Sequence, residues 1–140
     1  MEVTKLEVVK VVAAILGGIV GIWVTIPALV QVLLIFVLLD VVTGFFAAIV
    51  AHEVASKPIW IGGVRKFILL LVVYAAWLLD PHAEELFNVN LPIGQAVTIY
   101  YLAHEMISIT ENAKKADIPV PPFIIRLVSV LKGQAAQGDK

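Results

Sequence analysis

The chain has 140 residues, of which 61% are hydrophobic and 15% are charged, and its mean hydropathy is +0.99. A water-soluble domain carries charge at about a quarter of its positions, so this composition excludes an ordinary soluble globule and indicates a surface that faces lipid. The net charge of −1 argues against a nucleic-acid-binding protein, and the absence of cysteine excludes disulfide scaffolds, thiol catalysis and cysteine-based metal sites.

Residues 8–51 are predicted to form two membrane-spanning helices. Residues 11–39 contain no acidic or basic side chain, and the apolar character continues beyond Asp40. About 20 apolar residues cross a bilayer, so the stretch is long enough for two spans. Pro27 disfavours a helical residue before it and starts helices well, which places a turn between helices at about 8–26 and 28–51. The run exceeds the apolar core of a signal peptide, so it is interpreted as a retained membrane segment.

Two further spans are predicted downstream. Residues 52–63 contain Pro58 and a glycine pair and are expected to form a loop. A third helix is expected at about 64–79, a polar turn or short helix at 80–92, and a fourth helix at about 93–114. The charge-free part of the third helix is short for a bilayer, so it is expected to thin the membrane locally and to favour oligomerisation.

The last part of the chain, 118–140, is predicted to lie on the cytoplasmic side, after a transmembrane bundle formed by 1–117. It begins with a proline-rich turn, because prolines exclude a regular helix there. Residues 122–132 follow with apolar side chains on one face and polar ones on the other, as in an amphipathic helix. Residues 133–140 have nothing to bury and are expected to be disordered.

The basic residues predict the orientation. All ten Lys and Arg residues lie in 1–10, 52–66 and 111–140, and none lies in the Pro27 turn or in 80–92. Basic residues accumulate on the cytoplasmic side of a membrane, so four spans with both termini in the cytoplasm are predicted. Arg65 and Lys66 are expected to anchor the third helix at the cytoplasmic interface. The predicted fold class is an all-α integral membrane protein of about four transmembrane helices plus a C-terminal amphipathic helix.

Asp40 lies near the middle of the second predicted helix, where a charged group costs about 2.5–3.5 kcal/mol. Its carboxyl group is therefore expected to face other helices rather than lipid. Asp40, Thr43 and Gly44 share one small, polar helix face, of the kind that packs closely against a second helix. Two interpretations stay open: a packing residue inside the bundle, or a direct part in a polar path.

Two other helix faces stand out. In the first helix, small residues recur every four positions at Ala13, Gly17, Gly21 and Thr25, a ridge that allows close packing either against the second helix or against another copy. The fourth helix carries a polar stripe, which faces either partner helices or water lined by several copies. The candidate functional residues in this stripe are Thr98, Tyr101, Glu105, Ser108 and Asn112.

No pattern of catalytic or metal-binding residues is found. The three histidines lack the spacing of a metal site, and no nucleophile motif of the Gly-x-Ser-x-Gly type occurs. The expectation is therefore a protein with no catalytic residues, no metal and no cofactor, which is not an enzyme.

Four short motifs occur in a fixed order along the chain: Asp40-x-x-Thr43-Gly44, Gly62-x-x-Arg65-Lys66, Glu105-x-x-Ser108-x-x-Glu111-Asn112 and Pro119-x-Pro121. In this combination, the chain resembles the bacteriophage holin family, which includes toxin-secretion and phage-lysis holins. The resemblance implies a protein of the bacterial cytoplasmic membrane that forms homo-oligomers and opens lesions at a timed moment. The implied functional partner is an endolysin or a secreted toxin, with no direct contact required.

The residues by themselves leave other functions open. One alternative is a small oligomeric transporter or channel that uses Asp40 as a proton or ion site. Another is a compact membrane enzyme of the lipid-kinase type, which would need a nucleotide site, although no glycine-rich loop or carboxylate cluster for magnesium is found.

Overall fold

The computed structural model describes residues 2–52, 56–88 and 90–137, and every regular element in these ranges is helical. The elements, in chain order, are α1 (Glu2–Thr25), α2 (Ala28–Val50), α3 (Ser56–Leu79), the 3-10 turn η1 (Asp80–His82), α4 (Ala83–Phe87), α5 (Ile93–Lys115) and α6 (Pro122–Gln137). The predicted all-α class is confirmed.

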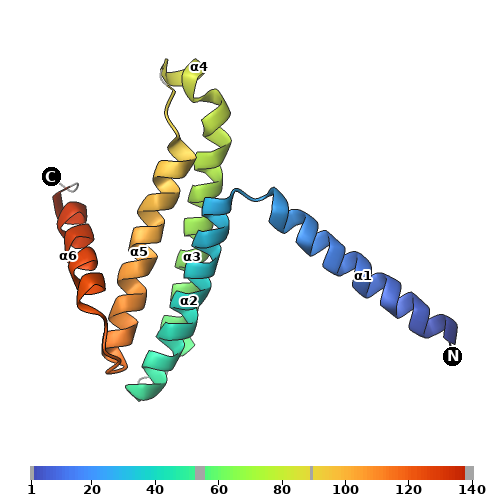
Figure 1. The fold of residues 1–140 in the computed structure, drawn as a ribbon, viewed down its shortest axis with the longest axis horizontal. Helices are drawn as coiled ribbons and strands as arrows, with labels where there is room; N and C mark the ends of the chain where they lie inside the picture. The colour runs from blue at the N-terminus through green and yellow to red at the C-terminus, as the bar shows by residue number, and fades with distance from the viewer. Residues whose placement is uncertain (1, 53–55, 89, 138–140) are drawn as a thin grey trace.

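Helix α5 is the centre of the molecule. It packs against α2, α3 and α6, and α6 runs back along it after a turn, whereas α1 diverges from the bundle (Figure 1). Few side chains are fully buried, because a bundle of this size has a thin interior; the buried apolar residues are Leu33, Ala47, Val73, Ala76, Ala83 and Val128.

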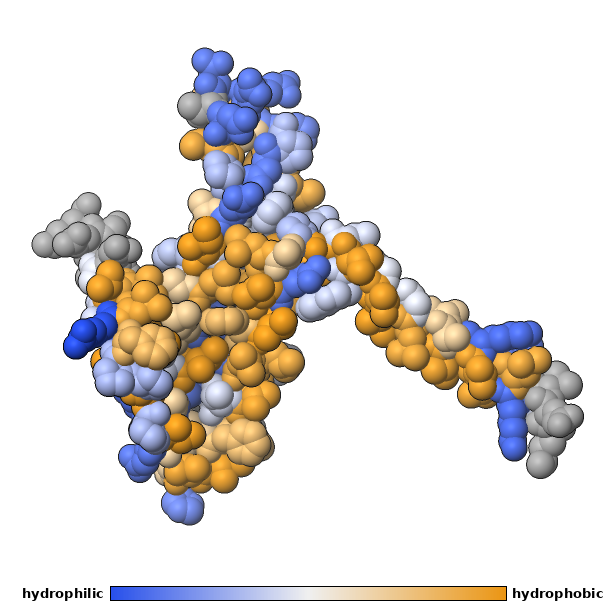
Figure 2. All heavy atoms as spheres, viewed as in Figure 1, coloured by the Kyte–Doolittle hydropathy of each residue, from blue (hydrophilic) through white to orange (hydrophobic). Residues whose placement is uncertain are grey.

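The surface of the molecule is that of an integral membrane protein. Among the described residues, three segments are long and apolar enough to cross a bilayer: Thr4–Thr25, Ala28–Val50 and Trp60–Phe87. Figure 2 shows apolar residues over α1 and over the middle of the bundle, while hydrophilic residues gather at the α4 end. Large apolar side chains such as Leu38 and Phe67 are exposed, which is stable only where the surroundings are hydrocarbon.

Helix α5 has the length of a span, 23 residues, but is less apolar than α2 and is not one of those three segments. Helices α2, α3 and α6 pack against it (Figure 1). A helix with polar side chains can lie at membrane depth when other helices shield these groups from lipid. That α5 is the fourth span therefore stays a prediction, and the packing around it is what such a span requires.

The chain breaks at Pro27 as predicted, since α1 ends at Thr25 and α2 begins at Ala28. The side-chain amide of Gln31 donates to the carbonyl oxygens of Trp23, at 3.0 Å, and of Ile26, at 2.9 Å. The last carbonyls of a helix have no partner within it, so Gln31 supplies donors that lipid cannot.

The loop predicted for 52–63 is wrong over most of its length, because α3 begins at Ser56; residues 53–55 lie outside the described ranges. Pro58 lies in the first turn of α3, where a missing backbone N–H breaks no helical hydrogen bond. The glycine pair costs about 1 kcal/mol per residue relative to alanine, and the helix continues through it. Helix α3 has 24 residues, but its charge-free part is still 67–79, so the expected thinning of the membrane stays a prediction.

The predicted short element in 80–92 is found as η1 and α4; residue 89 is outside the described ranges. The amphipathic helix is confirmed but is longer than predicted. Helix α6 continues to Gln137, so the disorder expected from residue 133 onward is wrong for 133–137. Alanine and glutamine are good helix formers, which explains the added turn. Residues 138–140 are not described.

Candidate functional site

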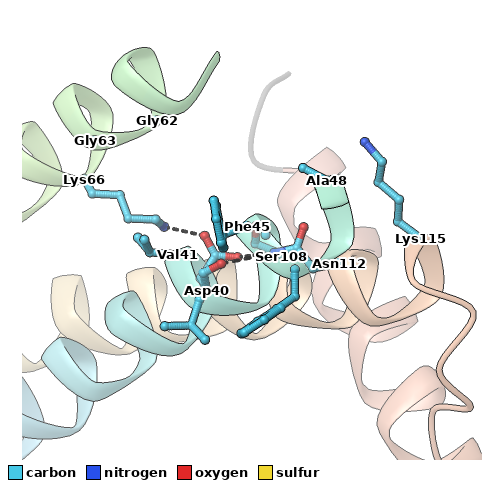
Figure 3. Close-up of a pocket in the computed structure, with 13 residues that line it drawn as sticks. Asp40, Val41, Phe45, Ala48, Gly62, Gly63, Lys66, Ser108, Asn112 and Lys115 are labelled. Carbon is cyan, nitrogen blue, oxygen red and sulfur yellow. Dashed lines mark hydrogen bonds and ion pairs between the residues drawn. The ribbon is translucent and has the colours of Figure 1, made fainter. Parts of the chain in front are cut away.

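A cavity of about 770 Å³ opens between α2, α3 and α5, near the end of the bundle where α2 ends and α3 begins (Figure 3). One wall is apolar and comes mainly from α2. Asp40, Lys66, Ser108 and Asn112 supply polar groups, and Lys115 lies at the end of α5. The cavity therefore leads to the charged groups in the interior of the bundle.

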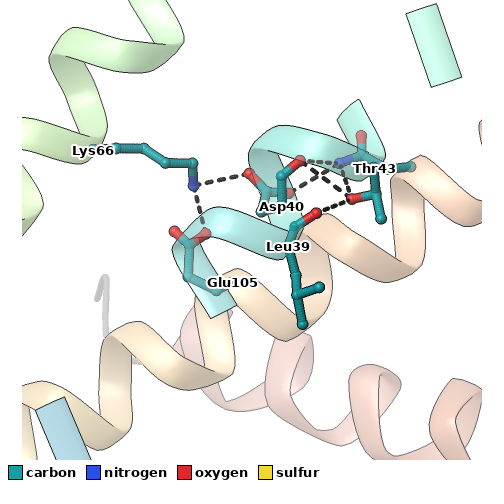
Figure 4. A network of polar contacts seen from close by, with 6 residues as sticks. Leu39, Asp40, Thr43, Lys66 and Glu105 are labelled. Carbon is teal, nitrogen blue, oxygen red and sulfur yellow. Dashed lines mark hydrogen bonds and ion pairs between the residues drawn. The ribbon is translucent and has the colours of Figure 1, made fainter. Parts of the chain in front are cut away.

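Three charged side chains from three helices meet beside this cavity. Lys66 Nζ of α3 lies 2.8 Å from Asp40 Oδ2 of α2 and 2.5 Å from Glu105 Oε2 of α5 (Figure 4). The exposed fractions of the Lys66, Asp40 and Glu105 side chains are 18%, 10% and 3%. Buried charges are tolerated when they are paired, so one lysine connects two carboxylates that would otherwise be unpaired in a membrane.

Asn112 completes this network from α5. Its side-chain amide donates to Asp40 Oδ1 at 2.9 Å, to the Asp40 carbonyl oxygen at 3.3 Å and to Thr43 Oγ1 at 3.3 Å. Thr43 in turn donates to the carbonyl oxygen of Leu39 at 2.8 Å. Both carboxylate oxygens of Asp40 are thus engaged, one by Lys66 and the other by Asn112. We refer to Asp40, Thr43, Lys66, Glu105 and Asn112 as the polar network.

Gly44 explains how Asn112 comes so close to α2. A Cβ atom built on Gly44 would lie 3.2 Å from Asn112 Nδ2, which is a tight contact. A glycine on the face shared with Asp40 therefore leaves room for the asparagine amide. The Asp40-x-x-Thr43-Gly44 motif and Asn112 act together in this contact.

A second polar cluster connects α3 to α5 near α4. Trp77 Nε1 donates to Thr98 Oγ1 at 3.0 Å, and Thr98 Oγ1 donates to the Gly94 carbonyl oxygen at 2.6 Å. The backbone N–H of Gly94 donates to Asp80 Oδ1 at 2.8 Å. Asp80 thus satisfies one of the unpaired N–H groups at the start of α5. A Cβ on Gly94 would lie only 2.7 Å from the Trp77 ring, so this position requires glycine.

The polar stripe predicted on α5 faces partner helices within the chain. Thr98 and Glu105 are buried, and with Asn112 they bind to groups on α2 and α3. Ser108 lines the cavity. Tyr101 is half-buried, and its ring meets that of Tyr100 edge-on, with 5.2 Å between the ring centroids. In this conformation Thr98, Glu105 and Asn112 therefore face partner helices, and a wall of water lined by several copies stays a prediction.

The Lys66 side chain does not extend away from the bundle, as expected of an interface anchor. Its amine is directed into the bundle and binds two carboxylates, whereas Arg65 is exposed. Asp40, Lys66 and Glu105 each stand out in the sequence, but the sequence does not pair them, because their helices are far apart along the chain. Their spacing in the sequence carries no signal of the contact.

Sequence reasoning missed Gln31, Trp77 and Asp80. Gln31 had a signal, because it is an amide within an otherwise apolar stretch, and an amide in a span needs partners. Asp80 lies in the segment predicted as a polar turn or short helix, and nothing in the sequence pairs it or Trp77 with residues of α5.

The small-residue ridge of α1 is not packed against another helix in the part of the chain that the structure describes. Nothing lies within 4 Å of a Cβ built on Gly17 or Gly21, and Ala13 is exposed. Thr25 donates to the carbonyl oxygen of Ile22 at 2.7 Å, within its own helix. Packing of this ridge against α2 is therefore not observed.

The chain is similar to proteins of bacteria and their phages. A protein of Halalkalibacterium halodurans is 32% identical over 128 residues, which are 91% of this chain and 93% of that protein. A protein described as a probable holin of Bacillus phage phi105 is 29% identical over 107 residues, 76% of each chain. A Bacillus subtilis protein is 27% identical over 107 residues, 76% of this chain and 74% of its own length. No solved structure matches the chain.

The family comparison covers most of the chain. The model of the bacteriophage holin family matches residues 14–133, a range that includes the polar network and the cavity. With an apolar, all-helical structure and a phage relative described as a probable holin, the chain belongs to the bacteriophage holin family.

Proposed function

We propose that this protein is a phage-type holin, which oligomerises in the bacterial cytoplasmic membrane and forms lesions that release an endolysin or a toxin at a timed moment. The observation that carries the proposal is the polar network, buried between three helices of a holin-family chain whose outer surface is apolar. The endolysin or toxin passes through the lesion and need not bind the protein.

The polar network gives a physical route to a lesion. The wall of a water-filled hole needs a polar face at membrane depth, and α5 has one in Thr98, Glu105 and Asn112. In this conformation α2 and α3 cover that face. A single copy that turned the face outward would expose charge to lipid at high cost, whereas several copies can surround water with it. Oligomerisation therefore precedes exposure of the polar face.

We propose four spans, with both termini in the cytoplasm. The arrangement of the basic residues supports this orientation, and the shielding of α5 by α2, α3 and α6 supports its crossing. The end of α2, the start of α3 and the α5–α6 turn then lie at one end of the bundle, and α4 lies at the other (Figure 1).

The self-association surface is proposed to include the ridge on α1, formed by Ala13, Gly17, Gly21 and Thr25. Its small residues allow two backbones to approach closely in lipid, where van der Waals packing drives helix association. Because the chain's own bundle leaves this face uncovered, a second copy can reach it without unfolding the first.

The alternative, a proton- or ion-coupled transporter that uses Asp40, is less well supported. A transport site needs a carboxylate that exchanges its partner, and here Lys66 and Asn112 engage both oxygens of Asp40. Transport would require this network to open in every cycle.

The experiment is induction in a bacterium with and without a co-expressed cytoplasmic endolysin, with membrane potential and culture density followed over time. A holin gives a delayed, abrupt depolarisation in both cultures, and lysis only where the endolysin is present. Slow, substrate-dependent proton uptake without abrupt depolarisation would contradict the proposal and favour the transporter.

A matched pair of variants tests the network in the same assay. Asp40→Asn keeps a side chain of similar size but removes the charge that pairs with Lys66, so it should accumulate normally and trigger at a different time. Asp117→Asn makes the same chemical change at an exposed position outside the bundle, and at a positive φ of 56° that asparagine accepts readily; it should trigger on the parent's schedule. Equal timing for both variants would limit Asp40 to packing.

A further inference from the structure

Helix α6 packs against α5 through one of its faces. Ile124, Val128 and Leu131 recur at the spacing of a single helix face; Val128 is buried, and the other two are half-buried. At the edge of this face Lys132 binds to Glu111 of α5. Because one side of α6 is held in this way, its other sides are turned toward the surroundings of the bundle.

A second apolar stripe lies next to the first and is uncovered. Phe123, Leu127 and Val130 repeat the same spacing one position earlier in the sequence, and their exposed fractions are 69%, 43% and 55%. Single exposed apolar residues are ordinary, whereas an aligned group of them marks a surface that contacts something else. Helix α6 is therefore apolar over a wider arc than its contact with α5 uses.

The polar residues of α6 lie opposite the two apolar stripes. Arg126 and Ser129 are exposed on this side, and Lys132 lies at its edge toward α5. Both charged residues of α6 are basic. A wide apolar face opposite a polar face with basic residues is typical of helices that lie in a membrane interface.

The position of α6 keeps this stripe close to the bilayer surface. Six residues, 116–121, separate α5 from α6, and they lie at the end of the bundle where α2 ends and α3 begins (Figure 1). Because α2 and α3 contain candidate membrane spans, this end of the bundle lies at the depth of the lipid headgroups. A linker of six residues reaches about 20 Å at most, so α6 cannot move far from that depth.

A lipid bilayer fits the uncovered stripe better than a protein partner does. A stable protein interface buries about 800 Å² on each partner, which is far more than three side chains of one helix stripe offer. Hydrocarbon needs no matching shape, and the gain from burial grows with the apolar area removed from water. The stripe is therefore large enough to hold α6 at a bilayer to which the chain is already attached, and too small to recruit a second protein.

We propose that α6 docks on the lipid bilayer through Phe123, Leu127 and Val130. These side chains lie among the acyl chains just below the headgroups, while Arg126 and Ser129 face the headgroups and water. The helix keeps its contact with α5, so it connects the end of α5 to one leaflet. This inference depends on the membrane location of the chain and not on lesion formation.

The test is spin labelling of the full-length protein in phosphatidylcholine nanodiscs, with one introduced cysteine per variant, since the chain has no native cysteine. Collisions with oxygen report hydrocarbon, and collisions with a water-soluble nickel chelate report water. Labels in Leu127→Cys and Val130→Cys should favour oxygen, as a label in Leu38→Cys does on the exposed surface of α2. A label in Ser129→Cys should favour nickel.

Two results would overturn the proposal. A preference for nickel at positions 127 and 130 would place the stripe in water. Weak collisions with both reagents, together with dipolar broadening between labels, would show that a second copy covers the stripe instead of lipid.

A matched pair of substitutions tests whether the stripe itself holds α6 at the bilayer. Leu127→Asp puts a charge into the stripe, so the label in Val130→Cys should lose most of its preference for oxygen. Ser129→Asp puts the same charge on the polar face and should leave that preference unchanged. Both variants keep the residues that pack on α5, and an unchanged size-exclusion peak checks their folding. An equal oxygen preference in the two variants would contradict the docking role of the stripe.

Discussion

Lys66 is the residue on which the contact between α2, α3 and α5 depends most. It is the one basic group bound to both Asp40 and Glu105, and no buried side-chain nitrogen or oxygen in the described ranges lacks a hydrogen-bond partner. In hydrocarbon an unpaired carboxylate costs far more than in water. When Lys66 pairs with both carboxylates, the polar network stabilises the observed packing of α2, α3 and α5. Loss of one of these ion pairs would favour a different packing of the three helices.

Lys66→Met should destabilise the bundle by about 3–5 kcal/mol, because removing one partner leaves buried charge uncompensated. The measurement is the midpoint of unfolding in a denaturing detergent, followed by the fluorescence of the native tryptophans. Arg65→Met is the control, since Arg65 is adjacent but exposed, and its midpoint should stay near the parent's. Adding Asp40→Asn and Glu105→Gln to Lys66→Met should recover part of the loss; no recovery would argue against the charge explanation.

Gly94 is a second position where one atom decides the packing. Gly94→Ala would bring a methyl group to 2.7 Å from the Trp77 ring and 2.8 Å from Asp80 Oδ2. Overpacking of this kind costs about 1–3 kcal/mol, so the temperature at which the detergent-solubilised protein loses its monodisperse size-exclusion peak should fall. Gly18→Ala, with open space around its Cβ, should not change that temperature. A lack of difference between the two variants would mean that α3 and α5 adjust freely at this contact.

At the scale of elements, α1 differs from the others because it diverges from the bundle after the turn at Pro27 (Figure 1). The carbonyl groups that end α1 are bound by Gln31 from the first turn of α2. The amide therefore controls the angle between α1 and α2 from the α2 side, and this angle determines where the small-residue ridge points.

Gln31→Leu should loosen this turn, because the Ile26 carbonyl oxygen loses its amide donor and the Trp23 carbonyl oxygen keeps the 3.3 Å bond from the Ile26 N–H. The expected cost is about 1 kcal/mol for the interhelical contact. The measurement is the distance distribution between spin labels at the exposed positions 15 and 38 in a reconstituted bilayer. We expect a broader distribution than in the parent. Gln95→Leu, the same change at an exposed position of α5, serves as control. A distribution as narrow as the parent's would show that Pro27 alone sets the angle.

For the whole molecule, the decisive property is the side of the membrane on which each connection lies. The chain contains no native cysteine, so single cysteines can be introduced without background. With four spans and cytoplasmic termini, His52→Cys and Gln134→Cys should react with a membrane-impermeant maleimide only after permeabilisation. Leu86→Cys, in α4, should react in intact cells or spheroplasts. Reaction of Leu86→Cys only after permeabilisation would overturn the proposed topology.

The sequence by itself determined the membrane class, the break at Pro27 and the approximate positions of the helices, because these depend on local hydropathy and on the backbone restrictions of proline. The four motifs also identified the family, because their order along the chain can be read without knowing which residues are in contact. The start of α3 was misplaced for a local reason: proline and a glycine pair are typical of a loop, yet both are tolerated where a helix begins or where lipid surrounds it.

Only the tertiary structure decided what the polar residues bind. Asp40, Lys66 and Glu105 lie on three different helices, so no periodicity within one helix can show that they meet. Hydropathy marked each as costly in a membrane, and the packing of α5 between α2 and α3 provided the partners that make each acceptable. The cavity likewise cannot be predicted from the sequence, because Gly62 and Gly63 line a cavity only where another helix lies beside them. Pairing and space depend on positions in three dimensions, whereas composition and periodicity determine only which residues need a partner.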